Sequence, residues 1–424
     1  MQKVVQKFII ERHQGSELFE MRVPLASSGL RDRDIEAVMR VLKSGNLTMG
    51  DEVKKFEAKM AAYLGTRHFV MVNSGSSANL LMIEALLRPA VVRPRLNTGD
   101  CVLVPAIAWP TTIWPLIQLG LNPLFVDVDR KTLAIDLDKA QELIDTSRIP
   151  VRGIFPIHPL GYAISPSKLD SFTEKNDLIL INDVCESLGS WNEGKHAGTS
   201  GVAGSFSFYF SHHITTMEGG GIATDDASMA DDLRSMRSHG WSRDRMDVDN
   251  WKSQVSNNDS RFLFVSTGYN VRPMEIQAAI GSLQIDEIDV FVSKRRNIAR
   301  RVQDSLEGSD LSIIGAETLI SEEGCKSNSW MLIPIRVLGE KAEERKKLIL
   351  EELETLNIET RPVLTGNFLA QPAIQRITRH AADPDNFSVA TEITKTAFLV
   401  GAHHDLSNEQ IEYLCKSLKM VSRK

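Results

Sequence analysis

A polar stretch in the first quarter of the chain has the residue types that hold a phosphate group. Residues 73–79 read Asn-Ser-Gly-Ser-Ser-Ala-Asn and lie between an apolar run, 68–73, and a helical window, 76–87. At such a junction the free backbone N–H groups of the first helical turn point at one place, where the helix dipole is positive. A phosphate would bind well there. A simple capping turn explains the same residues and, taken alone, is the favoured interpretation.

Two carboxylates and a tryptophan follow other apolar runs. Asp183 and Glu186 come directly after residues 178–182, and Trp109 comes shortly after residues 101–105. Ligands of α/β sheets bind at the carboxyl ends of strands, so one carboxylate could keep a pyridine-type nitrogen protonated and the indole could lie flat on an aromatic ring. The alternatives are a helix cap for Asp183 and a core or surface position for the tryptophan.

Two adjacent histidines are the best candidates for proton transfer. His212 and His213 follow the alternating run 205–210 and precede three glycines, which places them on a loop at a strand end. Adjacent side chains usually point in different directions, so we expect one catalytic histidine and one structural hydrogen-bonding partner rather than a shared metal ion. A second pair, His403 and His404, is interpreted as a polar turn, because no further spaced ligands accompany it.

The pattern around these residues predicts an α/β fold. Between about residues 31 and 240, short β-branched runs alternate with amphipathic windows, as in a mostly parallel sheet covered by helices on both faces. The predicted strands are 68–73, 101–105, 124–128, 153–158, 178–182, 205–210 and 221–224, and helices between them include 51–64 and 76–87.

A helical stretch over 273–306 and a weaker strand and helix pattern, with 330–337 apolar and 341–356 helical, predict a smaller C-terminal domain. We expect an N-terminal extension over 1–22, a large domain over 23–290 and a small domain over 291–424. No Pro/Gly/Ser-rich linker marks the boundary between the two domains.

Composition and charge narrow the class of protein. The 424 residues are 42% hydrophobic and 25% charged, which is typical of a globular protein with a full core. The net charge of −6 provides no basic field for nucleic acid or anionic lipid. Charged residues interrupt the first 20 positions and no later run approaches a membrane span, so we expect a cytoplasmic protein. The four cysteines are far apart, which argues against disulfides, a metal site or an iron–sulfur cluster.

Segments spread over nearly the whole chain together resemble the DegT/DnrJ/StrS family of sugar aminotransferases. They are VPLASS at 23–28, LTMG at 47–50, SGSSAN at 74–79, DVCES at 183–187, SHHI at 211–214, GYNVRP at 268–273 and RPVLTGNF at 361–368. Agreement of this kind, in order along the chain, is more specific than any single motif.

The family's aminotransferases carry a lysine on the loop after the sixth strand, and this lysine binds the cofactor covalently. His212 stands at the matching position, and no lysine occurs between Lys195 and Lys252. A small shift in alignment therefore cannot restore the lysine. An imidazole cannot condense with the aldehyde of pyridoxal 5′-phosphate (PLP), so the cofactor would be held by noncovalent contacts and could stay as pyridoxamine 5′-phosphate (PMP).

This substitution makes the resemblance closest to the 3-dehydratase subgroup without an iron–sulfur cluster, which contributes to deoxysugars such as colitose in lipopolysaccharide O-antigens. The resemblance implies the aspartate aminotransferase-like fold, fold type I of PLP-dependent enzymes. It also implies loss of the C3 hydroxyl from a nucleotide-linked 4-keto-6-deoxyhexose, with GDP-4-keto-6-deoxymannose expected, release of ammonia, and regeneration of PMP by L-glutamate. His212, whose ordinary pKa is near 6.5, would take a proton from C4′ of the cofactor.

The resemblance also assigns roles to individual residues. It places Gly75, Ser76 and Ser207 at the cofactor phosphate, Trp109 on the pyridine ring, Asp183 at the ring nitrogen, Glu186 near the ring hydroxyl, and Asn270 at the phosphate of the neighbouring subunit's cofactor. The last role implies a homodimer with shared active sites. Ser187, Ser211 and Arg243 are expected to bind substrate, Arg243 through the diphosphate. For Arg361, a glutamate carboxylate and a surface ion pair are both open interpretations.

Three other readings compete with a dehydratase. An ordinary sugar aminotransferase would have to recruit another lysine. A sensor that kept the fold and lost the chemistry would not need Asp183, Ser76 and Ser207. A Rossmann dehydrogenase is excluded because no GxGxxG motif follows the first predicted strand. The sequence leaves the nucleotide open, because GDP, CDP and dTDP are distinguished by loops.

Overall fold

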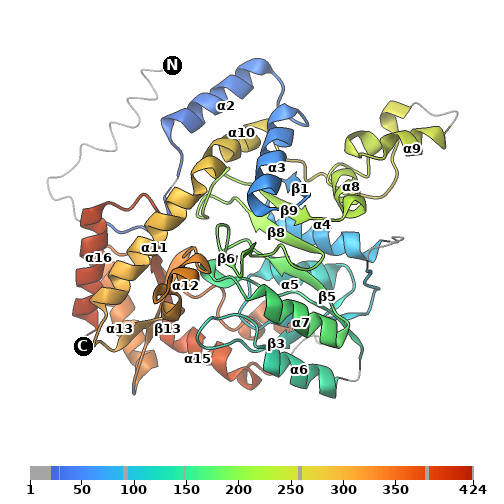
Figure 1. Cartoon of the computed structure of the whole chain (residues 1–424). Helices are drawn as coiled ribbons and strands as arrows, with labels where there is room; N and C mark the ends of the chain where they lie inside the picture. The colour runs from blue at the N-terminus through green and yellow to red at the C-terminus, as the bar shows by residue number, and fades with distance from the viewer. Residues whose placement is uncertain are drawn as a thin grey trace.

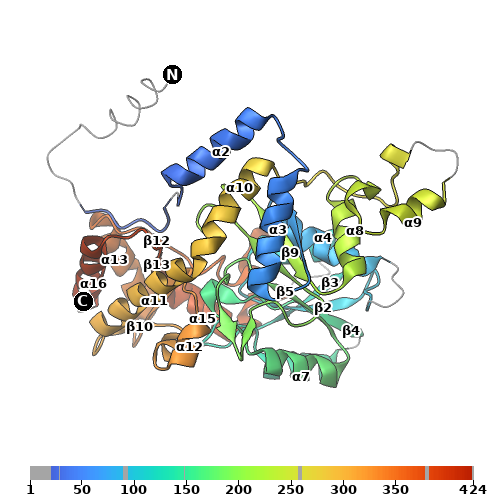
Figure 2. The ribbon, with the colours of Figure 1, turned by 45° about the horizontal axis from the view of Figure 1, so that its top comes forward.

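The structure is a computed structural model that describes residues 21–422, with the exception of 28, 89–93, 148, 256–259 and 378–381. The N-terminal extension expected over 1–22 therefore lies almost wholly outside the described residues. Most described elements are gathered around a seven-stranded and a four-stranded sheet, and the smaller of these two is built from residues 311–401 (Figures 1 and 2). A two-stranded sheet of β6 (Trp191–Asn192) and β7 (Lys195–His196) completes the set.

A seven-stranded sheet lies in the larger part of the molecule (Figure 1). In spatial order its strands are β1 (His68–Val72), β9 (Gly220–Thr224), β8 (Ala203–Ser207), β5 (Ile179–Asp183), β4 (Val151–Ile154), β2 (Cys101–Pro105) and β3 (Asn122–Val126). Only β9 is antiparallel to its neighbours, and the remaining pairs are parallel. The predicted α/β fold with a mostly parallel sheet is therefore confirmed.

Alternation along each strand explains why helices cover both faces of this sheet. In β1, Val70 and Val72 pack into the core beneath α4, α5 and α8, whereas Phe69 and Met71 pack into the core beneath α3 and α10. Helices α6 and α7 continue the second face over β2 to β5. The bounds are α3 (Asp51–Leu64), α4 (Gly75–Leu87), α5 (Pro110–Gln118), α6 (Leu137–Thr146), α7 (Pro166–Asn176), α8 (Ala227–Met236) and α10 (Glu275–Gln284).

The smaller sheet is antiparallel, in the order β10 (Leu311–Ile313), β11 (Leu332–Val337), β13 (Ala397–Gly401) and β12 (Thr360–Arg361). One face packs on α11 (Ile288–Ser305), α13 (Ala342–Thr355) and α16 (Asn408–Val421). The other face, with Leu332 and Leu399, joins the core of the large sheet.

The expected domain boundary near residue 290 falls in the first turn of α11. Phe291 of this helix packs with the large sheet's core and Val302 with the small sheet's core, so the helix connects the two. Val23, expected to begin the large domain, pairs with Ile358 and packs on the small sheet instead. The division into domains at these positions stays a prediction.

Strand β8 is shorter than the predicted run 205–210. It ends at Ser207, and a turn follows in which the His212 N–H donates to the Tyr209 carbonyl at 2.9 Å. Residues 209–212 therefore form a loop beyond the sheet edge rather than the end of a strand.

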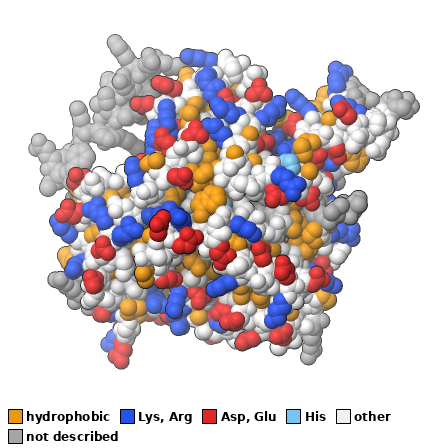
Figure 3. Space-filling view, in the orientation of Figure 1, with side chains coloured by type: hydrophobic (Ala, Val, Ile, Leu, Met, Phe, Trp, Pro, Cys, Tyr) orange, Lys and Arg blue, Asp and Glu red, His pale blue; other side chains and the backbone are white. Residues whose placement is uncertain are grey.

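The surface in Figure 3 shows acidic and basic side chains interspersed on one face of the molecule. Within the described residues, no helix is both long and apolar enough to cross a membrane. The four cysteines, Cys101, Cys185, Cys325 and Cys415, are all free thiols.

Candidate active site

A cavity of about 920 Å³ lies at the carboxyl edge of the seven-stranded sheet. Its floor and sides come from residues that directly follow β1, β2, β4, β5 and β8. The opposite wall comes from residues 22 and 24–27, from Met331 directly before β11, and from Arg361 of β12. The parallel sheet thus brings residues more than a hundred positions apart in sequence to one place, as α/β sheets do for ligands.

The stretch predicted to hold phosphate forms the first turn of α4 at this edge. The Ser74 hydroxyl accepts a hydrogen bond from the Ser77 N–H at 3.1 Å and so caps the helix. The N–H groups of Gly75 and Ser76 belong to the first turn, where the helix itself offers no acceptor. Both residues line the cavity, so the capping turn and the anion-binding turn are the same structure.

Close packing fixes this turn against the neighbouring strands. A Cβ atom at Gly75 would lie 2.6 Å from Ser207 Cβ and 3.0 Å from Cys185 Sγ, so only glycine fits there. A Cβ atom at Gly220 would lie 2.4 Å from the carbonyl carbon of Ser74, which shows how closely β9 approaches the turn. The cradle is therefore preformed, with the Ser207 side chain beside Gly75.

Asp183 ends β5 and is held in one orientation by three donors. Its Oδ2 accepts hydrogen bonds from Asn79 Nδ2 at 2.9 Å and Thr112 Oγ1 at 2.8 Å, and its Oδ1 accepts from the Cys185 N–H at 3.1 Å. The side chain is 5% exposed and lines the cavity. A buried carboxylate with this many donors is prepared to face a cationic nitrogen.

Glu186 and Arg361 form a loose pair across the cavity wall. Arg361 Nη2 lies 3.9 Å from Glu186 Oε1, and Glu186 Oε2 accepts a hydrogen bond from the Leu160 N–H at 3.0 Å. Burial raises the pKa of Glu186, and the charge of Arg361 opposes that rise. The two groups place one negative and one positive charge where a ligand can reach both.

Trp109 lines another side of the cavity. It precedes Pro110, whose fixed φ begins α5, and its side chain is 55% exposed. An indole that is anchored by a helix start and open on one face is free to cover a planar ligand.

His212 lies on the loop after β8 and lines the cavity with Ser211 and Tyr209. Its ring stands perpendicular to the Tyr209 ring at 6.0 Å, and its Nδ1 is buried with no hydrogen-bond partner among the described atoms. Burial, followed by the positive charges of Arg361 and Arg295, lowers the pKa of His212 to about 3. The imidazole is therefore neutral at pH 7 and able to accept a proton.

The residues that line the cavity, as far as the structure describes them, include no lysine. The positive groups on its walls are the guanidinium groups of Arg22 and Arg361. Neither can form the covalent bond that a lysine makes with an aldehyde.

Residues 29–419 match the model of the DegT/DnrJ/EryC1/StrS aminotransferase family. The chain belongs to this family. It is 37% identical to the GDP-4-keto-6-deoxy-D-mannose 3-dehydratase of Yersinia pseudotuberculosis over 404 residues, which cover 93% of this chain and 98% of the relative. The resemblance predicted from the sequence segments is thereby confirmed.

Solved structures of GDP-4-keto-6-deoxymannose 3-dehydratase give the same result. A histidine-to-asparagine variant with bound GDP-perosamine has a TM-score of 0.84 and 36% identity, covering 94% of this chain and 100% of the other. A structure with a trapped PLP-glutamate geminal diamine has a TM-score of 0.80 and 34% identity, with 94% and 100% covered. The aspartate aminotransferase-like fold expected for this family member is confirmed as well.

Three residues expected at the site do not line this chain's cavity, and the first is Ser187. Its side chain is fully buried; its hydroxyl donates to the His158 carbonyl at 2.6 Å and accepts from the Gly161 N–H at 3.1 Å. The hydroxyl therefore already donates one hydrogen bond and accepts another within the protein. Ser187 fixes the loop after β4 and is not placed to touch a substrate.

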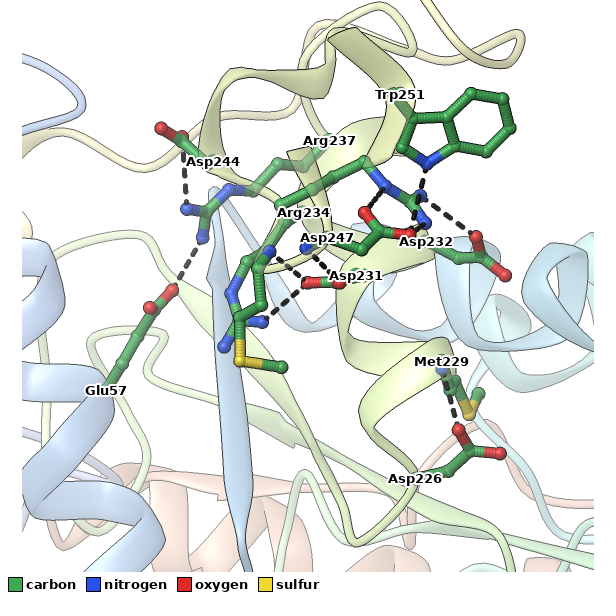
Figure 4. Close-up of polar contacts among 12 residues, drawn as sticks. Glu57, Asp226, Met229, Asp231, Asp232, Arg234, Arg237, Asp244, Asp247 and Trp251 are labelled. Carbon is green, nitrogen blue, oxygen red and sulfur yellow. Dashed lines mark hydrogen bonds and ion pairs between the residues drawn. The ribbon is translucent and has the colours of Figure 1, made fainter. Parts of the chain in front are cut away.

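Arg243 is exposed and lies away from the cavity. Its guanidinium carbon is 5.3 Å from the centre of the Trp241 ring. Figure 4 shows the ion pairs that hold this segment, in which Arg237 lies between Glu57, at 2.6 Å, and Asp244, at 3.7 Å. The side chain of Arg243 is therefore exposed to solvent on a segment that these ion pairs hold in place.

Asn270 is also exposed, and its backbone forms an isolated bridge with Ser238. Like Arg243, it does not line this chain's own cavity.

The second histidine of the loop turns away from the cavity. His213 is 1% exposed and, with His212, His403 and His404, lines a second, small cavity. His403 and His404 are 5% and 7% exposed, so the turn expected from the sequence at these residues is buried. The described part of this family member holds no group of three or more metal-ligating side chains.

Sequence reasoning assigned no role to Asn79 and Thr112, which hold Asp183. Asn79 lies one helical turn after Gly75 within an apolar helix and is 0% exposed. A single asparagine on the apolar side of a helix could have indicated that this side chain hydrogen-bonds to a buried polar group. Thr112 gave no such signal, because a threonine near a helix start is ordinary.

Proposed function

We propose that this protein is a PMP-dependent sugar-nucleotide 3-dehydratase. It removes the C3 hydroxyl of a nucleotide-linked 4-keto-6-deoxyhexose, GDP-4-keto-6-deoxymannose, releases ammonia, and uses L-glutamate to regenerate PMP from PLP. The observation that carries the proposal is His212 in a cavity whose described walls contain no lysine. The relative and the structures named for this reaction, which match almost the whole chain, support it.

The cavity fits a PMP or PLP cofactor. We assign its phosphate to the N–H groups of Gly75 and Ser76 and to the Ser207 hydroxyl, because the turn is preformed and glycine at position 75 lets it pack directly against Ser207. When bound, the cofactor supplies an amine that combines with the sugar ketone and a ring that accepts electrons. The protein's own residues hold that ring and move the protons.

Asp183, Glu186 and Trp109 are assigned to the ring. Asp183 receives two side-chain hydrogen bonds on Oδ2, which hold its carboxylate toward the cavity to pair with a protonated ring nitrogen. Glu186, whose pKa is raised by burial, is assigned to the ring hydroxyl. Trp109 covers the ring face and excludes water from it.

His212 is the proposed catalytic base. Its ring is neutral at physiological pH, and it acts on the proton at the cofactor's C4′ carbon. The described residues that line the cavity offer no lysine to carry a proton onward to the sugar carbon, so loss of the C3 hydroxyl prevails over transfer of the amino group. After it has taken this proton, His212 can donate it to the departing C3 hydroxyl, so that the hydroxyl leaves as water.

Glutamate and the sugar nucleotide are assigned to the rim of the same cavity. Arg361 is half-buried and faces the cavity, so its guanidinium is placed to bind a glutamate carboxylate. The structure of a relative with a trapped PLP-glutamate adduct supports glutamate as the donor. Ser211 lines the cavity beside His212 and is assigned to the substrate.

We also propose a homodimer with shared active sites, located in the cytoplasm. Arg243 and Asn270 are exposed outside this chain's cavity, and we assign them to the diphosphate and the cofactor phosphate in the partner's site. Helix α2 (Asp32–Ser44) has an apolar stripe of Ile35, Met39 and Leu42, which are 54%, 47% and 49% exposed. Such a stripe is typical of an interface. The domain limits, 23–290 and 291–424, are part of this proposal.

One incubation tests the reaction. Purified protein is mixed with PLP, L-glutamate and GDP-4-keto-6-deoxymannose, and ammonia release and product mass are followed together. A dehydratase gives one ammonia per sugar and a 4-keto-3,6-dideoxy product. A product that retains nitrogen at C4 means an aminotransferase, and no reaction with GDP-, CDP- or dTDP-linked 4-keto-6-deoxyhexoses means a protein that kept the fold without the chemistry.

A further inference from the structure

Arg295 is a fully buried arginine that reaches the loop of His212 from behind. It lies on α11, is 1% exposed, and its Nη2 donates a hydrogen bond to the His212 carbonyl at 3.2 Å. Its Nη1 donates to the Met331 carbonyl at 2.9 Å and to the Trp330 carbonyl at 3.4 Å. One guanidinium thus connects the loop after β8 to the residues that lead into β11.

This charge is buried at a cost. Among the described residues, no carboxylate lies within salt-bridge distance of Arg295, and its Nε has no partner. Burial lowers the pKa of Arg295 to about 10, with the more distant charge of Asp405 opposing the change, so the guanidinium remains protonated at pH 7. Burying a cation without a carboxylate partner costs free energy of folding. Hydrogen bonds to backbone carbonyls alone therefore do not explain why an arginine occupies this position.

We propose that Arg295 is a positioning residue for the dehydration, which fixes the His212 loop to the small sheet and keeps a positive charge behind the imidazole. This inference rests on the proposed function, because it gives His212 the role of base. Met331, held by the same guanidinium, lines the cavity wall opposite the large sheet. Arg295 therefore sets the distance between the base and that wall.

The charge acts together with other groups that face His212. They are Arg361 on β12, His213, Tyr209 and Glu218 on the same loop, His403 and His404 after β13, Asp183 at the end of β5 and Glu186 after it. The positive charges of Arg361 and Arg295 both disfavour the imidazolium, so they keep His212 in its proton-accepting form. Arg361 will be covered by a bound carboxylate during the glutamate half-reaction, whereas Arg295 is never exposed to ligand.

Two substitutions separate position from charge. Arg295→Lys keeps the positive charge but loses the planar set of guanidinium N–H donors, whereas Arg295→Gln removes the charge. The control is Arg296→Gln in the next position of α11, because Arg296 also donates to backbone carbonyls, those of Asn328, Gly189 and Lys326, and not to the His212 loop. All variants are measured as full-length protein loaded with PMP.

We expect both Arg295 variants to lower kcat by about tenfold to a hundredfold, with KM for the sugar nucleotide within about threefold of wild type. The acid limb of the kcat/KM profile moves to higher pH in Arg295→Gln, because a repelling charge is gone, and stays near wild type in Arg295→Lys. Arg296→Gln keeps the wild-type kcat and acid limb. Arg295→Gln with kcat within about threefold of wild type and an unmoved limb would overturn the proposal.

A measurement that does not depend on enzymatic turnover distinguishes failure of this proposal from failure of the proposed function. The His212 ring is titrated by ¹⁵N NMR in wild type, Arg295→Gln and Arg296→Gln, with His212→Asn used to assign its signal. An upward shift in the His212 titration in Arg295→Gln alone supports the proposal even if the reaction differs from dehydration. Equal titrations in wild type and Arg295→Gln count against it even if dehydration is confirmed. If Arg295→Gln fails to fold, Arg295→Lys with wild-type kcat sinks the positioning role.

Discussion

Asn79 donates a 2.9 Å hydrogen bond to Oδ2 of Asp183, from the second turn of the helix whose first turn forms the proposed phosphate site. Thr112, near the start of α5, donates to the same oxygen. The carboxylate assigned to the ring nitrogen is therefore oriented by the two helices that also carry the phosphate site and Trp109. Helix α4 begins with the phosphate turn, Trp109 directly precedes α5, and both helices orient Asp183 at the end of β5, so the sites for phosphate, ring face and ring nitrogen are held in one geometry.

Thr112→Val should weaken cofactor binding while leaving the shape of the core unchanged. Loss of a hydrogen bond to a charged group costs about 1.5–3 kcal/mol, which predicts a Kd for PMP higher by roughly tenfold or more. Thr173→Val is the matched control, because Thr173 is a buried threonine on α7 that donates only to backbone carbonyls. Cofactor absorbance measures the Kd of each protein. Equal affinities in Thr112→Val and wild type would show that Asp183 does not depend on Thr112.

His212→Ala should abolish dehydration, because it removes the imidazole that we assign to take the proton from C4′ of the cofactor. His212→Lys should shift the protein toward covalent attachment of PLP and formation of an amino sugar. Borohydride reduction followed by peptide mass spectrometry detects the attachment, and product mass detects the amino sugar. A wild-type protein that borohydride labels on some other lysine contradicts the dehydratase assignment, and unchanged dehydration in His212→Ala contradicts the role of the histidine.

The sequence predicted the sheet and the cavity floor well, because both depend on local patterns. Polar residues directly after apolar runs, such as Asp183 and the turn at Gly75, mark the carboxyl edge of a parallel sheet, where the structure places them. The far wall was harder to predict. Pro24 and Arg361 meet there through pairing of distant segments, which no local pattern specifies.

The buried side of the His212 loop was missed for a related reason. Arg295 belongs to a run, Lys294-Arg295-Arg296, that reads as a solvated helix face, yet Arg295 is 1% exposed. Helix α11 lies between the two sheets and is covered on both sides, so its basic residues do not share one environment. The burial of the turn with His403 and His404 was not predicted for the same reason, because α11 packs against this turn. The ring of His404 stacks on Phe291 at 3.9 Å.

His158 should make the protein less stable in mild acid. Burial lowers its folded pKa to about 4, and its neutral ring accepts the Ile164 N–H at Nδ1 and bonds Asn182 Oδ1 through Nε2. The unfolded chain, with a histidine pKa near 6.5, binds the proton more readily. The free energy of unfolding therefore falls as pH drops below 6.5, by about 2 kcal/mol between pH 7 and 5 from this residue.

Urea unfolding at pH 7 and pH 5 measures this contribution. The difference between the two pH values should be smaller by that amount in His158→Gln than in wild type, since glutamine does not titrate. His239→Gln, at an exposed histidine, should leave the difference unchanged. A wild-type pH dependence in His158→Gln would mean that the ring does not resist protonation in the folded state.

Met39→Asp should separate the proposed dimer into monomers. Met39 lies at the centre of the exposed stripe on α2, whose opposite face packs on α10 through Ala37 and Val41. A carboxylate buried in an apolar interface costs several kcal/mol, whereas on a free surface it costs almost nothing. Sedimentation velocity should therefore give a dimer for wild type and for Glu36→Lys, an exposed change off the stripe, and a monomer for Met39→Asp. The monomer should also lose dehydration, because Asn270 no longer reaches a partner's site. A wild-type monomer, or a dimeric Met39→Asp, would exclude α2 as the interface.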